Sequence, residues 1–184
     1  MQFITDLWLP IILSAVFVFV VSSVIHMFLG YHASDLKKLP DEEKTMDTLR
    51  PLNIPPGQYA MPKAASMKEF GSEEYKAKVK RGPVMFLTVK NGDLGMGKSL
   101  FQWFIYSIVV GIFSAYLGVH AVGPDGDYLD VFRYVGCAAF MGYSLALFQA
   151  PIWMTQNWSA TLKSAFDGLI YALVTAGTFG WLWV

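Results

Sequence analysis

The stretch that decides the fold is Leu7–Tyr31, which reads LWLPIILSAVFVFVVSSVIHMFLGY. As a helix it would rise about 37 Å, more than the roughly 30 Å thickness of the hydrocarbon core of a bilayer. Pro10 fits a helix because it falls in the first turn, where backbone N–H groups have no intrahelical partner. Asp6 is the expected N-cap. We therefore predict a first membrane span over about 7–31.

Three further apolar blocks follow, at about 100–122, 129–153 and 164–184. Residues 123–128, GPDGDY, separate the second block from the third and are typical of a tight hairpin. Uncharged apolar helices of this length are common in membrane proteins and rare in the cores of soluble proteins. The sequence therefore predicts an all-α membrane protein, a four-transmembrane-helix bundle forming a single membrane domain over 1–184.

Charge is segregated along the chain, although the formal net charge is +0. All of the fourteen Lys and Arg residues except Arg133 and Lys163 lie between the first and second blocks. The positive-inside rule therefore assigns residues 33–98 to the cytoplasm and both termini to the periplasmic side. The six tryptophans lie near the predicted helix ends, as in the aromatic belts of membrane interfaces.

The loop over 33–98 is expected to be extended and partly helical. The acidic residues after Pro40 predict a short helix, and the proline-rich stretch 51–62 predicts extended chain. Ser72 is expected to cap a helix that stops at Gly82 and Pro83. Residues 84–89, VMFLTV, predict a strand.

A phosphate-loop pattern follows that strand, because GDLGMGKS at 92–99 matches G-x-x-x-x-G-K-[ST]. A nucleotide-binding loop also needs a covered parallel sheet and a strand-end aspartate for magnesium, and the loop has no room for a second βαβ unit. We therefore interpret Gly92, Gly97, Lys98 and Ser99 as a chance match. No catalytic residue and no cofactor is predicted.

His26 is the candidate functional residue of the first helix, where it shares a polar face with Ser14 and Ser22. A histidine at membrane depth could ligate a metal or relay protons. A metal needs further ligands, but His120 belongs to the opposite end of the second span, and in a continuous helix His32 at i+6 faces another direction. The sequence thus favours a histidine bonded to a neighbouring helix, with no metal site.

Asp167 is the second candidate, because it enters the last helix at about the depth of His26. A contact between His26 and Asp167, with Ser22 close by, would form an intramembrane polar site. Lys163 competes for Asp167 as an i,i+4 partner. At the other surface, Asp130 and Arg133 are spaced as an i,i+3 pair.

Small residues predict close helix packing in the third and fourth blocks. They are Ala138, Gly142 and Ala146 in the third block and Gly177 and Gly180 in the fourth. The expected partners are the lipid bilayer and other membrane protein subunits or a second copy of the chain. No nucleic acid partner is expected.

The first helix, PPGQY at 55–59, SMKEFGSEEY at 66–75 and DGLIYALVTAGTFGWLWV at 167–184 resemble a family of small bacterial inner-membrane proteins of uncharacterised function. The resemblance covers most of the chain. It implies a multi-pass protein of the bacterial inner membrane, and it implies no catalytic residue.

Three functions are compatible with these patterns. The first is a non-catalytic accessory or scaffold subunit of a larger bacterial membrane complex. The second is a small transporter or channel with a proton or solute path near His26 and Asp167. The third, ranked below both, is a nucleotide-dependent membrane enzyme built on Gly92–Ser99. The sequence favours the first because it offers no complete catalytic site.

Overall fold

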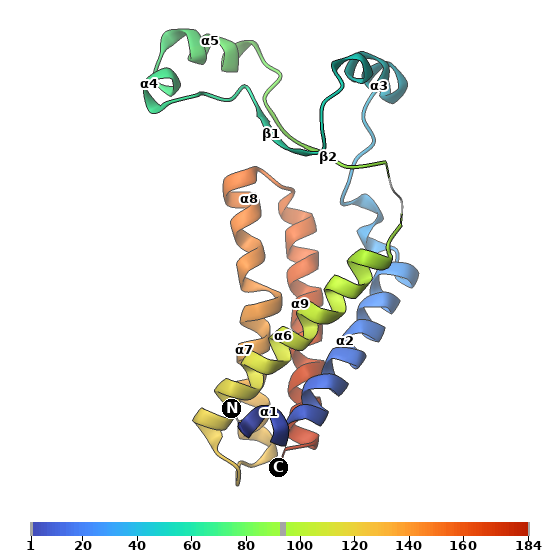
Figure 1. Cartoon of the computed structure of the whole chain (residues 1–184), viewed down its shortest axis with the longest axis vertical. Helices are drawn as coiled ribbons and strands as arrows, with labels where there is room; N and C mark the ends of the chain where they lie inside the picture. The colour runs from blue at the N-terminus through green and yellow to red at the C-terminus, as the bar shows by residue number, and fades with distance from the viewer. Residues whose placement is uncertain (1, 93–94, 184) are drawn as a thin grey trace. The chain divides into compact units, whose positions relative to one another are not determined.

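A computed structural model describes residues 2–92 and 95–183 of the chain (Figure 1). The chain divides into two compact units. Unit 1 comprises Met1–Lys37 with Met96–Val184, and unit 2 comprises Lys38–Gly95. Asp93 and Leu94 of the phosphate-loop pattern lie outside the described residues, as does Val184 at the end of the fourth predicted span.

Unit 1 is helical. Its elements are α1 (Gln2–Asp6), α2 (Trp8–Phe28), η1 (Tyr31–Ser34), α6 (Gly97–Val122), α7 (Tyr128–Tyr143), η3 (Leu145–Phe148), α8 (Gln149–Met154) and α9 (Trp158–Trp181), where η denotes a 3-10 helix. Helix α2 packs against α6 and α9, and α7 packs against the same two helices. The four long helices therefore form a bundle, and α1 and the end of α9 lie at the end where α2 begins (Figure 1).

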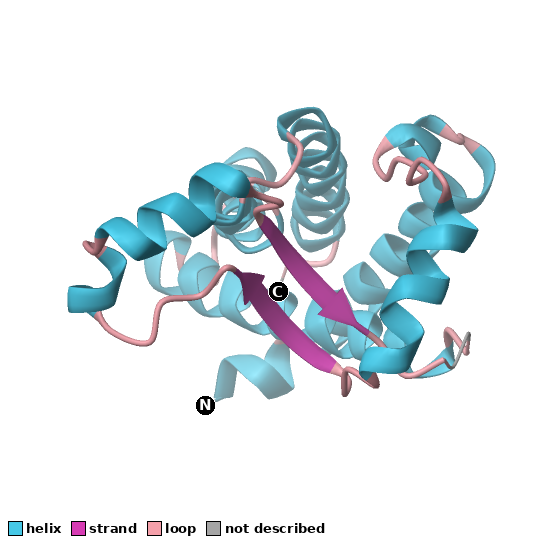
Figure 2. Ribbon diagram, turned by 90° about the horizontal axis from the view of Figure 1, so that it is seen from above, coloured by secondary structure: helices cyan, strands magenta, loops and turns pink. Residues whose placement is uncertain are grey.

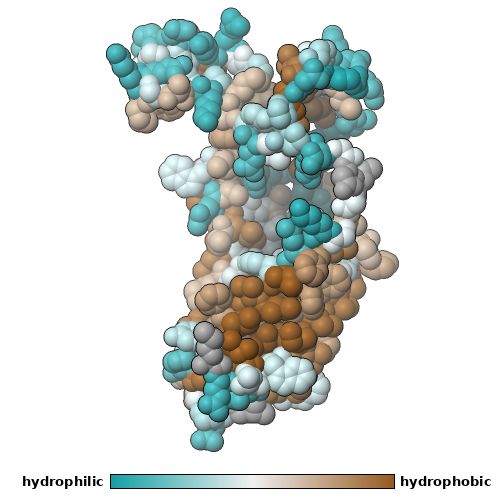
Figure 3. Space-filling view, in the orientation of Figure 1, coloured by the Kyte–Doolittle hydropathy of each residue, from teal (hydrophilic) through white to brown (hydrophobic). Residues whose placement is uncertain are grey.

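Among the residues that the structure describes, three helical segments are long and apolar enough to cross a membrane. They are Trp8–Phe28, Gly97–Val122 and Tyr128–Met154. Many of their large apolar side chains are exposed, including Phe17, Val20 and Phe113. Figure 3 shows apolar residues gathered over the helices of unit 1. This outward apolar surface is compatible with a membrane protein, since lipid is a solvent in which such a surface is stable.

Three helix ends differ from the sequence-based expectation. Helix α2 is capped at Leu7 without a side-chain hydrogen bond, so Asp6 is not its N-cap, and it stops at Phe28. The third block is interrupted at Ser144, after which the chain forms η3 and then α8. Pro151 is the third residue of α8, where its nitrogen cannot donate to the carbonyl of Leu147.

The small residues of the bundle were predicted with mixed success. Ala138 is buried, and a β-carbon on Gly142 would stand 3.1 Å from Val110 of α6. Gly180 meets the ring of Tyr128 in the same way. Ala146 is exposed in η3 and does not pack helices, because the third helix has already broken at that point.

The tightest approach in α9 is at Gly168, which the sequence analysis did not select. A β-carbon there would lie 2.8 Å from the carbonyl oxygen of Tyr143. The Ser144 hydroxyl also donates to the carbonyl of Ala165, at 3.0 Å. By contrast, the nearest atom to a β-carbon on Gly177 is the Tyr128 hydroxyl at 3.9 Å. The end of α7 is therefore held against the first half of α9.

Unit 2 contains short elements only. They are α3 (Glu42–Leu49), η2 (Arg50–Leu52), β1 (Gly57–Met61), α4 (Met67–Phe70), α5 (Glu73–Arg81) and β2 (Met85–Val89). The Ser72 hydroxyl accepts from the Tyr75 N–H, and α5 ends at Gly82, which confirms the predicted cap and stop. Strands β1 and β2 pair antiparallel with Tyr59 opposite Leu87 (Figure 2). The sequence indicated extended chain at both strands but not their pairing.

The phosphate-loop pattern follows β2 and leads into α6, which begins at Gly97. In the part of the chain that the structure describes, β2 has one neighbour, the antiparallel strand β1. The strand and helix of the pattern are therefore present, while the chance-match interpretation of Gly92, Gly97, Lys98 and Ser99 stays a prediction.

Candidate functional site

The candidate site forms where the chain leaves α2. The helix ends at Phe28, and Gly30 takes the left-handed conformation with φ of 65°. Glycine suits this position because other residues pay a steric penalty there. The reversal starts η1, which returns His32 to the end of α2. There the ring of His32 stacks on that of His26, with centroids 4.7 Å apart and planes 5° apart.

This geometry corrects the expectation that His32 faces away from His26. That expectation extended one straight helix through residue 32, whereas α2 stops four residues earlier. Helix periodicity does not apply across a turn. The argument that His26 has no second histidine beside it is therefore wrong.

Asp167 of α9 is the buried member of the site, with 2% of its surface exposed. Its carboxylate faces Nε2 of His32 at 2.7 Å and accepts a hydrogen bond from the Tyr31 hydroxyl. A buried carboxylate is tolerated only when it is paired and hydrogen-bonded. Tyr31 and His32 of η1 are those partners. A histidine was predicted beside Asp167, and the structure places His32 rather than His26 in direct contact with it.

His32 connects two carboxylates. Its Nδ1 lies 2.5 Å from Asp35 and its Nε2 lies 2.7 Å from Asp167. The side chain of Asp35 is 18% exposed, against 3% for Asp167. The imidazole therefore stands between a carboxylate near the surface and a carboxylate inside the bundle.

Lys163 fixes η1 to α9. Its Nζ donates to the Tyr31 carbonyl at 2.7 Å, to the Ser34 hydroxyl at 3.0 Å and to Asp35 at 2.7 Å. The expected i,i+4 pair between Lys163 and Asp167 is thus replaced by long-range bonds. The hydrogen bond from Lys163, followed by that from His32, lowers the pKa of Asp35 below its ordinary value.

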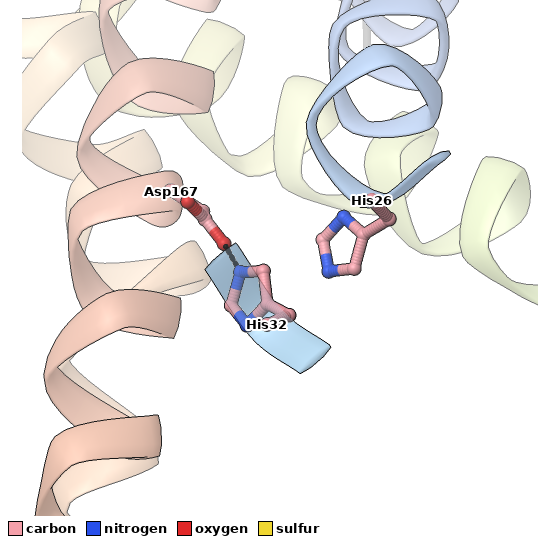
Figure 4. Close-up of side chains that lie close together, drawn as sticks. All are labelled: His26, His32 and Asp167. Carbon is pink, nitrogen blue, oxygen red and sulfur yellow. Dashed lines mark hydrogen bonds and ion pairs between the residues drawn. The ribbon is translucent and has the colours of Figure 1, made fainter. Parts of the chain in front are cut away.

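His26 completes the site from α2. Its Nδ1 is 3.0 Å from the carbonyl oxygen of Ser22, and the residue as a whole is exposed. His26, His32 and Asp167 each offer one ligand atom, and these atoms all lie within 4.8 Å of one another (Figure 4). The structure therefore brings together two histidines and a carboxylate from three separate elements.

Ser22 contributes to the site through its backbone only. Its hydroxyl donates to the Phe19 carbonyl and accepts from the indole N–H of Trp103, both at 2.9 Å. The bond from Trp103 joins α6 to α2. The side chain that sequence analysis assigned to the polar site is thus a helix-packing group.

A buried polar stripe continues along α9 from Asp167. Tyr171, Thr175 and Thr178 follow it on the interior face, each at most 5% exposed. The hydroxyls of Tyr171 and of Ser114 on α6 are buried without a hydrogen-bond partner among the described residues. Buried hydroxyls of this kind are where proteins hold ordered water.

Tyr31 and Asp35 were not among the predicted site residues, and His32 was predicted to face away from His26. The signal that could have found them is Gly30, a helix-stopping residue followed at once by the polar run YHASD at 31–35. The sequence pattern alone placed residues 30 and 31 at the end of the first apolar block.

At the opposite end of unit 1, the contacts of Arg133 and His120 are local, while the indole N–H of Trp183 donates to the carbonyl of Gly123 at 3.0 Å. Arg133 bonds Asp130 at 3.0 Å, which confirms the predicted pair. His120 lies 2.8 Å through Nδ1 from the carbonyl oxygen of Tyr116, four residues earlier in its own helix.

No protein-family model, curated protein or solved structure matches the chain. The functional argument therefore rests on the geometry of the His26, His32 and Asp167 site.

Proposed function

We propose that the chain is a small membrane transporter or channel for a proton or a small cation, with its path starting at the His26, His32 and Asp167 site. The observation that carries this proposal is the buried carboxylate of Asp167, which His32 links to the more exposed Asp35. Ionisable groups at this depth are costly, and in membrane proteins they mark ion paths more often than packing sites.

The polar stripe of α9 supports the same proposal. Tyr171, Thr175 and Thr178 extend about 16 Å beyond Asp167 at the helical rise of about 1.5 Å per residue. The unpartnered hydroxyls of Tyr171 and Ser114 give waters or a hydrated ion further contacts. Past the stripe, Phe179 and Leu7 belong to a buried apolar cluster. Opening of that cluster is the conformational step that transport requires.

The proposal includes a membrane crossing by α9, which is 24 residues long. Four polar residues that lower the hydropathy of α9 are buried in the bundle, where lipid does not meet them: Thr161, Asp167, Thr175 and Thr178. It also includes the arrangement inferred from charge, with unit 2 in the bacterial cytoplasm and both termini in the periplasm.

Flux into proteoliposomes tests the proposal. Purified chain is reconstituted, and proton, monovalent cation and divalent cation entry are followed with internal dyes. We expect flux of one of these ions, reduced at least tenfold by Asp167→Asn. His120→Ala is the matched control, because that histidine makes a local backbone bond at the other end of the bundle. Wild-type protein that conducts none of the three ions above empty liposomes would overturn the proposal.

The second candidate is an accessory subunit of a larger membrane complex, and one observation favours it. In unit 2, no described residue is buried, and Met46, Phe70 and Phe86 are at least half exposed. A two-stranded sheet is marginally stable by itself in water. A further protein surface that covers these side chains would stabilise unit 2.

A photo-crosslinker placed at Phe86 tests this candidate in native membranes. We expect a crosslink to a second protein, absent when the crosslinker replaces Lys76, an exposed residue paired locally with Glu73. A crosslink only within the same chain, together with a monomer in mild detergent, would dismiss the accessory role.

A further inference from the structure

We infer that His26, His32 and Asp167 bind a divalent first-row transition metal ion, of which Zn²⁺ is the test case. The inference deepens the proposed function, because it rests on the same site and names the cation. Each of the three residues offers one ligand atom, and these atoms lie within 4.8 Å of one another. Nε2 of His32 faces a carboxylate oxygen of Asp167 at 2.7 Å.

The donor set selects the class of metal. Two imidazole nitrogens and one carboxylate suit zinc and neighbouring divalent ions, whereas calcium and magnesium prefer oxygen ligands throughout. The site also carries a suitable charge. The cluster contains two carboxyl groups, those of Asp167 and Asp35, and one lysine ammonium, that of Lys163. A cation is therefore attracted, and a bound anion is not.

The outer hydrogen bonds orient both imidazoles for metal binding. Nδ1 of His26 donates to the Ser22 carbonyl in the tautomer that leaves the Nε2 lone pair free. Nδ1 of His32 is held by Asp35, which is itself bonded to Lys163. A carboxylate or carbonyl behind each metal-binding histidine is the usual outer arrangement of zinc sites. Tyr31 plays that part for Asp167.

Binding requires a limited movement. Ligands of a tetrahedral zinc ion stand about 3.4 Å apart, given metal–ligand distances near 2.1 Å. Nε2 of His32 and the Asp167 oxygen, now 2.7 Å apart, must therefore separate, and the ligand atom of His26 must move into position beside them. The parallel stack of the two rings must also open, because lone pairs in parallel planes do not converge. His26 is the group free to move, since it is exposed near the end of α2, whereas Asp167 is buried in the bundle.

The site spans three elements, so metal binding would join α2, η1 and α9. The bound ion would leave one tetrahedral position open to water, as in zinc sites whose metal is exchanged or reactive. A path for the ion would then continue from Asp167 along the α9 stripe.

Zinc titration of the purified full chain tests the inference. The protein carries an affinity tag without histidines, and Zn²⁺ is titrated against a fluorescent chelator of known affinity. We expect one equivalent of Zn²⁺ per chain, with affinity at least tenfold weaker in His26→Ala and in Asp167→Asn. His120→Ala should bind as the wild type does, although His120 makes the same bond to the carbonyl four residues earlier.

Two outcomes would overturn the inference. One is the absence of saturable Zn²⁺ binding in the micromolar range, and the other is wild-type affinity in His26→Ala. His26→Ala keeps the test sharp if Asp167→Asn fails to fold, because an exposed side chain can be removed without opening the bundle. Zn²⁺ binding without ion flux would support the metal site and overturn the transport proposal. Proton flux without Zn²⁺ binding would support the transport proposal and overturn the metal site. Substitution of Co²⁺ adds a visible absorption spectrum that reports nitrogen and oxygen ligation directly.

Discussion

The two ends of unit 1 use charge in opposite ways. At the His32 end, ionic contacts join η1 to α9 across more than one hundred residues of sequence, and the His32–Asp167 pair is 16% and 3% exposed. At the hairpin end, Arg133 and Asp130 are three residues apart and are 69% and 47% exposed. The contacts at the His32 end determine where separate elements meet. The Asp130–Arg133 pair lies within one helix and joins no other element to it.

The largest expected difference comes from removing the buried carboxylate. Asp167→Ala leaves His32 and the Tyr31 hydroxyl without their partner in a poorly hydrated place, and we expect a loss of about 3–5 kcal/mol in the free energy of unfolding. Reversible unfolding in detergent measures it. The comparison between the two ends would fail if Asp130→Ala destabilised the protein equally.

The second-largest effect should come from disturbing the packing of α9 against the end of α7, beside the same site. Gly168→Ala forces a β-carbon against the backbone carbonyl of Tyr143, which cannot move aside as a side-chain tip would. We expect a destabilisation of about 1–3 kcal/mol. Gly177→Ala on the same helix is the control, since its added carbon meets only ordinary contacts, and it should be neutral or stabilising by up to about 1 kcal/mol. Equal melting temperatures of the two variants would show that α9 does not approach α7 as closely as inferred.

Loss of the lysine that fixes η1 should have a local effect. Lys163→Met keeps the length of the side chain but removes three hydrogen bonds to η1 and Asp35. We expect faster amide hydrogen exchange over residues 31–35, with little change in α6 or α7. Lys76→Met, which removes an exposed local pair with Glu73, should leave that exchange unchanged. Unaltered exchange in Lys163→Met would mean that other contacts hold η1.

The long apolar helices were predictable because their signal lies in consecutive residues. The helix over Leu7–Tyr31 can be predicted without knowing which distant residues contact it. The cap at Ser72 can be predicted from three neighbouring residues. The site is different, since Lys163 and Tyr31 are 132 positions apart. The site could not be predicted because of one turn. At Gly30 the left-handed backbone reverses the chain and places His32 beside His26. Periodicity describes residues inside a helix, so it failed where the helix stopped.

Acid should weaken the His32 end of unit 1 in a defined direction. Because Lys163 and His32 lower the pKa of Asp35 in the folded protein, the stabilisation by Asp35 is complete above its ordinary value of 3.8. It is lost as the pH falls through the lowered pKa, since protonation removes the charge that Lys163 contacts. In metal-free protein, hydrogen exchange over 31–35, corrected for intrinsic rates, should rise over that acid range. Asp35→Asn should show no such rise, and a rise of equal size in this variant would assign the acid effect to another group.

The smallest effect belongs to the hairpin end. An exposed i,i+3 pair contributes about 0.2–1 kcal/mol, because water screens the charges and both side chains lose freedom on pairing. A double-mutant cycle of Asp130→Ala and Arg133→Ala should therefore give a coupling energy in that range, smaller still at high salt. The corresponding cycle of Lys163→Met and Asp35→Asn should give a larger coupling that salt affects less, because those side chains are 24% and 18% exposed. If both couplings were equal and equally salt-sensitive, sequence separation would not distinguish the two ends, and the His32 end would be as solvated as the hairpin.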